Sequence, residues 1–323
     1  MEQEKTMLRG TRQMESKNSE PPKETLPQVN HSTIRPVRRR LRTDSISPWQ
    51  LALYRLLENR LAMFGLCLVC LILLVITCAP LLTSYESDAM NYSAILKAPS
   101  VDHMFGTDDM GRDIFTRVIF GGRESLKVGF LGIFIALAGG LILGISTTYI
   151  GGWVDNLTQR AVEITLAFPT MLLLLCVVAI LGPSLTTVLI ALGVSSIPGF
   201  TRLVRGSVIN IKSMEYITAA RVLGVSNLRI MTHYILPNVL GPILVFGSLG
   251  LSSAILVTAG LSYIGLGAQP PSPEWGAMLN YGRNYISSAW WMSFFPGAAI
   301  FLTVLGINLF GDGLRDALDP KSR

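Results

Sequence analysis

Long stretches without a charged residue alternate with short charged segments along this chain. Five windows contain no Asp, Glu, Lys or Arg, namely residues 61–85, 128–154, 164–201, 230–273 and 284–311. They are 25 to 44 residues long, whereas a helix needs about 20 mostly apolar residues to cross the hydrocarbon core of a bilayer. Helices of soluble proteins rarely run so far without a polar face. The pattern therefore predicts an all-α membrane protein rather than a soluble protein with buried core helices.

Two of these windows are too long for a single span. The window 164–201 divides at Gly182-Pro183, because glycine commonly ends a helix and proline commonly begins one. The window 230–273 holds one span, because its last part is rich in glycine and proline and is typical of a loop. The sequence thus predicts six transmembrane helices, at about 61–82, 128–150, 164–181, 184–200, 240–261 and 289–310.

The distribution of positive charge predicts the orientation of these helices. If the N-terminus is inside, the inner segments hold 21 of the 27 Lys and Arg residues and the outer loops hold six. Cytoplasmic loops collect Lys and Arg, so we expect both termini in the cytoplasm. The basic cluster Arg38–Arg42 lies shortly before the first span. We expect it to fix the topology and contact anionic membrane lipid rather than nucleic acid.

Composition separates the start of the chain from the rest. Half of all residues are apolar and 15% are charged, against about 25% charged residues in soluble domains. Residues 1–48 are polar and nearly free of aromatic side chains, which predicts a disordered cytoplasmic tail. Residues 49–60 place Trp49, Leu53 and Leu57 on one helical face, which predicts an amphipathic helix at the membrane interface. A cytoplasmic extension of the first span is the alternative.

The external loop after the first span contains three carboxylates close together, Asp108, Asp109 and Asp113. They lack the ligand spacing of a calcium loop. The sequence instead predicts a turn followed by a helix that begins near Asp113. Ile114, Phe115, Val118 and Ile119 would form its apolar side.

The chain lacks the motifs of an enzyme. It has no G-x-x-x-x-G-K-[ST] loop for nucleotide phosphates and no G-x-S-x-G nucleophile motif. His31, His103 and His233 lie far apart, and Cys67 and Cys70 stand in apolar sequence without charges that would lower a thiol pKa. We therefore expect no catalytic residue, no metal site and no bound cofactor, and we interpret the cysteines as small buried hydrophobes.

No Asp, Glu, Lys or Arg lies inside any predicted span. Proton-coupled carriers and voltage sensors usually need such groups, because a proton or charge resides on them in transit. This counts against a self-powered pump. It favours a passive pore or a subunit driven from outside the membrane.

The segment 202–238, between the fourth and fifth predicted spans, contains the features of a helical hairpin. Ser213 can cap a short helix, and Gly224 can end it as a left-handed residue. Ser226 can cap a second helix, which we expect to finish near Pro237. Between these, Ala219 and Ala220 are small enough for a partner surface to approach the backbone closely. An ordinary surface hairpin is the alternative.

This segment resembles the E-A-A-x3-G-x9-I-x-L-P loop of ABC-importer permeases. The matching residues are Ala219, Ala220, Gly224, Leu236 and Pro237. Thr218 stands where the family often has Glu, and Tyr234 stands where it often has Ile. Neither difference removes the glycine turn or the pair of small residues.

Further blocks are similar to the dipeptide/oligopeptide/nickel branch of these permeases, and specifically to its second (C-type) subunit. The blocks are Gly106–Asp113, Gly122–Leu126, Gly151–Asp155, Leu166–Pro169, Leu261–Pro271 and Gly311–Pro320. The resemblance extends from about Leu61 to the C-terminus. It implies the type I ABC-importer permease architecture, with a transmembrane core at 121–312 preceded by a first helix and external segment at 61–120. A cytoplasmic tail at 313–323 would follow.

The resemblance also implies a division of labour in a bacterial (inner) cell membrane. A homologous permease would complete the pathway, two ABC ATPase subunits would hydrolyse ATP, and an extracellular or periplasmic binding protein would deliver a peptide. The helix containing Thr218, Ala219 and Ala220 would sit in a cleft of one ATPase, so this chain itself would be no enzyme. A nickel or glutathione importer of the same family is one alternative. A channel or secondary carrier is another, but it has no use for this loop.

Overall fold

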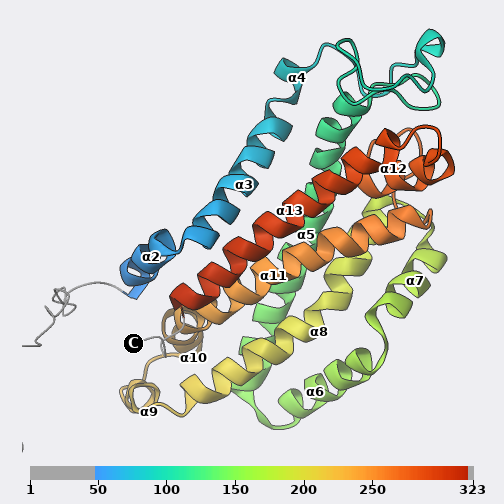
Figure 1. Ribbon diagram of the computed structural model, residues 1–323. Helices are drawn as coiled ribbons and strands as arrows, with labels where there is room; N and C mark the ends of the chain where they lie inside the picture. The colour runs from blue at the N-terminus through green and yellow to red at the C-terminus, as the bar shows by residue number, and fades with distance from the viewer. Residues whose placement is uncertain (1–47, 319–323) are drawn as a thin grey trace, which may run out of the picture. The chain divides into compact units, whose positions relative to one another are not determined.

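A computed structural model describes residues 48–318 of the protein. Residues 1–47 of the predicted disordered tail, with the basic cluster Arg38–Arg42, lie outside the described residues. The last five residues of the predicted C-terminal tail lie outside them as well. Within the described part the regular elements are helices, as predicted (Figure 1).

The helices follow one another with short connections, apart from the long external segment after α4 and the loop 264–274 between α11 and α12. Their bounds are α2 (Pro48–Glu58), α3 (Arg60–Thr77), α4 (Ala79–Leu82), η2 (Tyr92–Ala94), α5 (Ile114–Ile150), α6 (Gly152–Ala167), α7 (Thr170–Leu181), α8 (Leu185–Lys212), α9 (Glu215–Val222), α10 (Asn227–Arg229), η3 (Ile230–Ile235), α11 (Leu236–Tyr263), α12 (Trp275–Gly282), η4 (Arg283–Tyr285) and α13 (Trp291–Leu318). Five helical stretches of the described part are long and apolar enough to cross a membrane, and α6 with α7 adds a sixth if this bent pair is one span. This agrees with the predicted fold class.

The second predicted span is part of a longer helix. Asp113 caps α5 as expected, because its Oδ2 accepts the backbone N–H of Thr116 at 2.8 Å. From there α5 continues without a break for 37 residues. The predicted external helix and the predicted span 128–150 are therefore one element. The predicted core limits at 121 and 312 both fall inside continuous helices, α5 and α13.

The third predicted span, 164–181, is wrong in its first part. α6 ends at Ala167, α7 begins at Thr170, and the two axes meet at 90°. Pro169 between them explains the break, because proline has no N–H to donate and disfavours a helical residue before it. The 12 residues of α7 span only about 18 Å. The absence of charge across the window concealed this bend.

A seam of small residues joins α5 to α8, which run parallel to each other. Gly140 lies against Phe200, and four residues further along α5, Gly144 lies against Val204. A side chain at either glycine would overlap these neighbours. Small residues at this spacing let two membrane helices approach closely, where dispersion forces hold them together.

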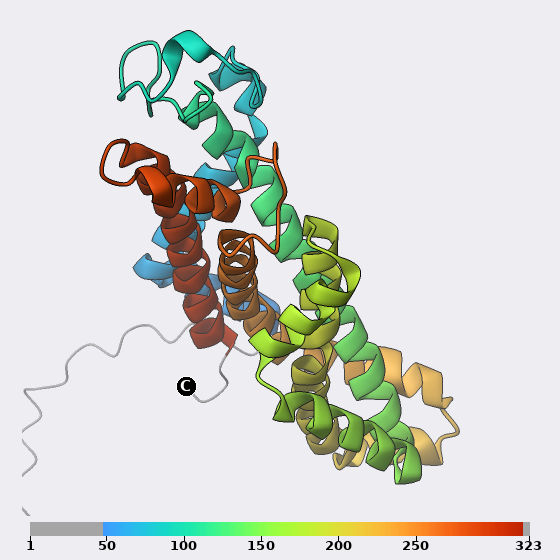
Figure 2. The same ribbon diagram turned by 90° about the vertical axis from the view of Figure 1, so that its right-hand side faces the viewer.

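The first and last long helices pack antiparallel, so both ends of the described chain lie at one end of the bundle. Gly65 of α3 lies against Gly306 of α13, and Ala62 lies against Gly313. Asn59 separates α2 from α3 and caps α3 with its side chain, so α2 is not a continuous extension of the first span. α9 lies at the same end as α2, whereas α12 and the external segment lie at the other (Figures 1 and 2).

Candidate functional site at α9

The short helix α9 ends in the predicted left-handed turn. Gly224 has a φ of 77°, and the N–H of Val225 donates to the carbonyl of Ala220 at 3.1 Å. The predicted N-cap is wrong, because Met214 occupies that position and the Ser213 hydroxyl donates to the carbonyl of Asn210 instead. Glu215 lies in the first turn, where its charge favours the helix dipole.

α9 has an inner and an outer face. Ile217 and Ala220 are 0% and 5% exposed and belong to an apolar cluster with Ile230 and Ile235. Thr218 and Ala219 are exposed on the other side. Ala220 is therefore small because it packs against this chain's own core, which corrects the expectation that both alanines face a partner.

The second helix of the predicted hairpin begins after Ser226 as predicted, but it does not end near Pro237. The Ser226 side chain makes no capping hydrogen bond. After α10, the π-helix η3 leads directly into α11, which contains Pro237 in its first turn. The helix therefore passes through Pro237 instead of ending there. The wider π-helical turn precedes a residue that has no N–H to donate to the turn before it.

These results locate the six candidate residues in three places. Thr218, Ala219 and Gly224 lie at the surface of the α9 turn. Ala220 and Leu236 contact the same apolar cluster, Ala220 as a buried member and Leu236 as a partly buried neighbour. Pro237 is exposed at the start of α11.

Sequence reasoning missed the large apolar side chains of the outer face. Val222 and Leu223 are 83% and 82% exposed, and Leu228 beyond the turn is 68% exposed. Residues four apart share a helix face, so Val222 continues the face of Thr218 and Leu223 that of Ala219. Large exposed apolar side chains on a short connecting segment suit an interaction surface.

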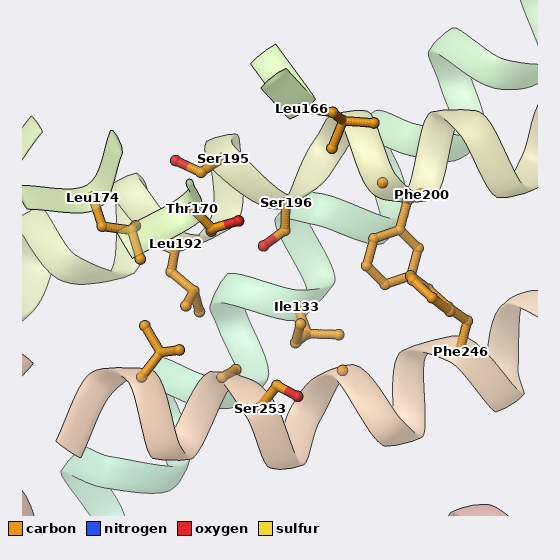
Figure 3. A pocket seen from close by; sticks show the side chains of 14 residues that line it. Ile133, Leu166, Thr170, Leu174, Leu192, Ser195, Ser196, Phe200, Phe246 and Ser253 are labelled. Carbon is orange, nitrogen blue, oxygen red and sulfur yellow. The ribbon is translucent and has the colours of Figure 1, made fainter. Parts of the chain in front are cut away.

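A cavity of about 270 Å³ lies among α5, α7, α8 and α11. Most of its lining is apolar or glycine, including Leu192 and Phe246, and none of the described residues that line it is charged. Its hydroxyl-bearing residues are Thr170, Ser195, Ser196 and Ser253 (Figure 3). Leu166 and Thr170, on either side of the α6–α7 bend, both belong to its wall. The wall therefore offers a few hydrogen bonds within a mainly apolar surface.

In the described part of the chain, no group of three or more His, Cys, Asp or Glu side chains could hold a metal ion. Cys67 and Cys70 are exposed on α3 rather than buried within the chain, which corrects their interpretation as buried residues.

Two family models match the sequence. The model described as binding-protein-dependent transport system inner membrane component matches residues 136–323. The model described as N-terminal TM domain of oligopeptide transport permease C matches residues 47–99.

Curated relatives match most of the chain. It is 50% identical to the dipeptide transport system permease protein DppC of Alkalihalophilus pseudofirmus, over 86% of this chain and 92% of that protein. It is 43% identical to the probable D,D-dipeptide transport system permease protein DdpC of Escherichia coli K12, over 79% and 86%. It is also 43% identical to the glutathione transport system permease protein GsiD of Escherichia coli O1:K1, over 85% and 91%.

Among solved structures, the fold is similar to a chain of the inward-facing MetNI methionine ABC transporter. The TM-score is 0.52 at 20% sequence identity, over 63% of this chain and 96% of that chain. Because the identity is low, this likeness concerns the fold alone.

Proposed function

The chain belongs to the family of binding-protein-dependent transport system inner membrane components, and we propose that it is the C-type permease subunit of an ATP-driven peptide importer. The relative at 50% identity, a dipeptide permease, supports a short peptide as the substrate. Glutathione is itself a small peptide, so the glutathione relatives agree with this substrate class without favouring glutathione over dipeptides.

The observation that carries the proposal is the exposed outer face of α9. Val222 and Leu223 form an apolar surface on a connecting segment outside the long helices. The sequence has no phosphate-binding loop of its own. We therefore assign ATP binding and hydrolysis to two partner ATPase subunits, one of which receives α9, and we assign no cofactor to this chain.

We assign the other partners, the binding protein, the second permease and membrane lipid, from the orientation of the bundle. We place α9 and both termini in the cytoplasm of a bacterial cell, as the Lys and Arg distribution supports. The external segment and α12 then face an extracellular or periplasmic binding protein. A homologous permease completes the pathway, with the permease core of this chain at about 121–312. Exposed apolar residues of α3, such as Phe64 and Leu71, suit membrane lipid.

The mechanism assigns each candidate residue a role. Thr218 and Ala219 contact the ATPase, and Gly224 sets the angle at which α9 is presented. Ala220 and Leu236 hold α9 in place by packing in the apolar cluster that contains residues of α5, α8 and α11. Closure of the ATPases moves α9 with this cluster. The long helices follow and expose the cavity alternately to each side, while Pro237 lies in the first turn of α11 beside the moving segment.

Reconstitution tests this function. The chain is incorporated into vesicles with its homologous permease and two ATPases, and the binding protein is added with a labelled dipeptide. Uptake should require ATP and should disappear when this chain or the ATPases are omitted. Uptake that continues without ATPases would favour a channel or carrier and overturn the proposal.

The substrate is tested by competition in the same vesicles. Unlabelled dipeptides should suppress uptake at lower concentration than glutathione or Ni²⁺. Stronger competition by glutathione or by Ni²⁺ would leave the ATP-driven permease intact and reassign its substrate.

A further inference from the structure

Tyr149, in the last turn of α5, contacts three other elements of the bundle. Its ring lies beneath two cations, with Arg221 Cζ of α9 at 5.1 Å and Lys212 Nζ of α8 at 5.7 Å from the ring centroid. Its hydroxyl donates to Asn227 Oδ1 of α10 at 2.8 Å. The residue is only 7% exposed. Tyr149 therefore joins the end of α5 to the elements on both sides of the Gly224 turn.

Lys212 of α8 also binds the end of α5. Its ammonium group donates to the backbone carbonyls of Thr148 at 3.1 Å and Tyr149 at 2.8 Å. Carbonyls at the end of a helix have no partner within the helix, and the helix dipole is negative there. The ends of α5 and α8 thus form one unit, to which Arg221 and Asn227 attach the turn.

The apolar cluster that buries Ile217 and Ala220 and the contacts of Tyr149 restrain α9 in different ways. Hydrophobic burial of Ile217 and Ala220 is not directional, so it resists separation more than it resists rotation or sliding. A hydrogen bond and a cation above an aromatic face need a defined geometry. The contacts of Tyr149 therefore fix the direction in which α9 is held.

We propose that Tyr149 is a positioning residue for ATPase coupling, which makes α9 and the end of α5 move together. The inference rests on the proposed function, because it takes α9 as the ATPase contact. With Tyr149 in place, a displacement of the outer face of α9 moves α5. Without it, α9 rotates against the apolar cluster, and its displacement is not passed on to α5.

The elements after Tyr149 lead toward the cavity. The chain turns at Gly151, and α6 begins at Gly152; both glycines have a positive φ. The first turn of α6 is tied to α8 through Asp155 and Arg205. α6 ends at the bend whose neighbours Leu166 and Thr170 line the cavity. A movement of the α5 end is therefore connected to the cavity wall through one helix, α6.

The test compares variants of the full reconstituted complex by the number of peptides transported per ATP hydrolysed. Tyr149→Phe and Asn227→Ala each remove the same hydrogen bond, so each should lower this ratio about 2- to 5-fold. The double variant should be no lower than the worse single variant, because contacts that share one bond are not additive. Tyr149→Leu also removes the aromatic face and should lower the ratio about 10-fold or more while ATP hydrolysis continues.

Tyr263→Phe is the matched control. The Tyr263 ring also lies close to a cation, with Arg283 Cζ 5.6 Å from the ring centroid, but it stands at the end of α11 away from α9, so the ratio should stay at the wild-type value. Tyr149→Phe and Asn227→Ala preserve the packing and decide the question if Tyr149→Leu fails to assemble.

Two results would overturn the role of Tyr149. One is a wild-type ratio in assembled Tyr149→Phe and Asn227→Ala complexes, and the other is a strictly additive loss in the double variant. A different result would overturn the proposed function, namely a wild-type chain that neither binds ATPases nor supports ATP-dependent uptake.

Discussion

The Arg205 guanidinium holds the Asp155 carboxylate through two hydrogen bonds, Nε to Oδ1 at 3.0 Å and Nη2 to Oδ2 at 2.8 Å. The pair joins α8 to the first turn of α6. Two parallel bonds between a guanidinium and a carboxylate fix orientation as well as distance. The pair is partly buried, with the Asp155 side chain 13% and the Arg205 side chain 32% exposed.

Removing this carboxylate should destabilise the protein. Asp155→Ala should lower the free energy of unfolding by about 1–3 kcal/mol, because a charged hydrogen-bond partner is lost from a partly buried site. Thermal unfolding of the purified complex measures the change. Glu163→Ala is the matched control, because its ion pair with Arg160 is 62% and 79% exposed and contributes less than about 0.5 kcal/mol. Equal effects of the two variants would contradict this assignment.

The seam between α5 and α8 should not tolerate even a methyl group. Gly140→Ala should destabilise the protein by about 1–3 kcal/mol, because the added Cβ would overlap Phe200. Gly206→Ala on α8 faces open space, so it should be neutral or stabilise by up to about 1 kcal/mol through helix propensity. Thermal unfolding of both variants measures these effects. An unchanged melting temperature for Gly140→Ala would argue against the close packing of α5 and α8.

The turn at Gly224 should discriminate between side chains by backbone conformation alone. A Cβ at Gly224 meets no neighbour, so only its positive φ restricts substitution. Gly224→Val should reduce uptake strongly, because a β-branched residue in this conformation costs about 1–2 kcal/mol and tilts α9. Gly224→Asn should retain most uptake, since asparagine tolerates the left-handed region. Normal uptake by a fully expressed Gly224→Val complex would show that the turn angle is not needed.

The orientation of the bundle is tested by labelling in intact cells. In a variant without native cysteines, Ser100→Cys in the external segment should react with a membrane-impermeant thiol reagent. Ser213→Cys, just before α9, should react only after the cells are opened. Both serines are exposed, so access to the reagent depends on the side of the membrane. The reverse pattern would invert the proposed topology.

The sequence predicted the elements whose signals are local. Absence of charge marked the long helices, and Asp113 and Gly224 marked a helix start and a turn through their own side-chain and backbone chemistry. The break at Pro169 was missed because the surrounding residues are uncharged, and hydropathy does not report the direction of a helix. The continuous passage through Pro237 was missed because it depends on the π-helix before it.

The candidate site was predicted less completely, because its arrangement depends on contacts between distant segments. The Ala219-Ala220 pair gives no indication of which alanine faces inward. That is decided by Ile230 and Ile235, which pack against Ala220. The sequence contained no indication of a role for Tyr149, because its hydrogen-bond partner Asn227 lies 78 residues further along the chain. Outward-facing Val222 and Leu223 were detectable from the four-residue spacing once the inner face was known.

The central claim is that the outer face of α9 contacts an ATPase subunit, and neighbouring alanines test it most directly. In the assembled complex, a short thiol crosslinker should join Ala219→Cys to an ATPase, with a yield that changes between nucleotide-free and ATP-bound states. Ala220→Cys should give little product, because that position is only 5% exposed. Absence of any ATPase crosslink from Ala219→Cys, in a complex that still transports peptide, would contradict the account.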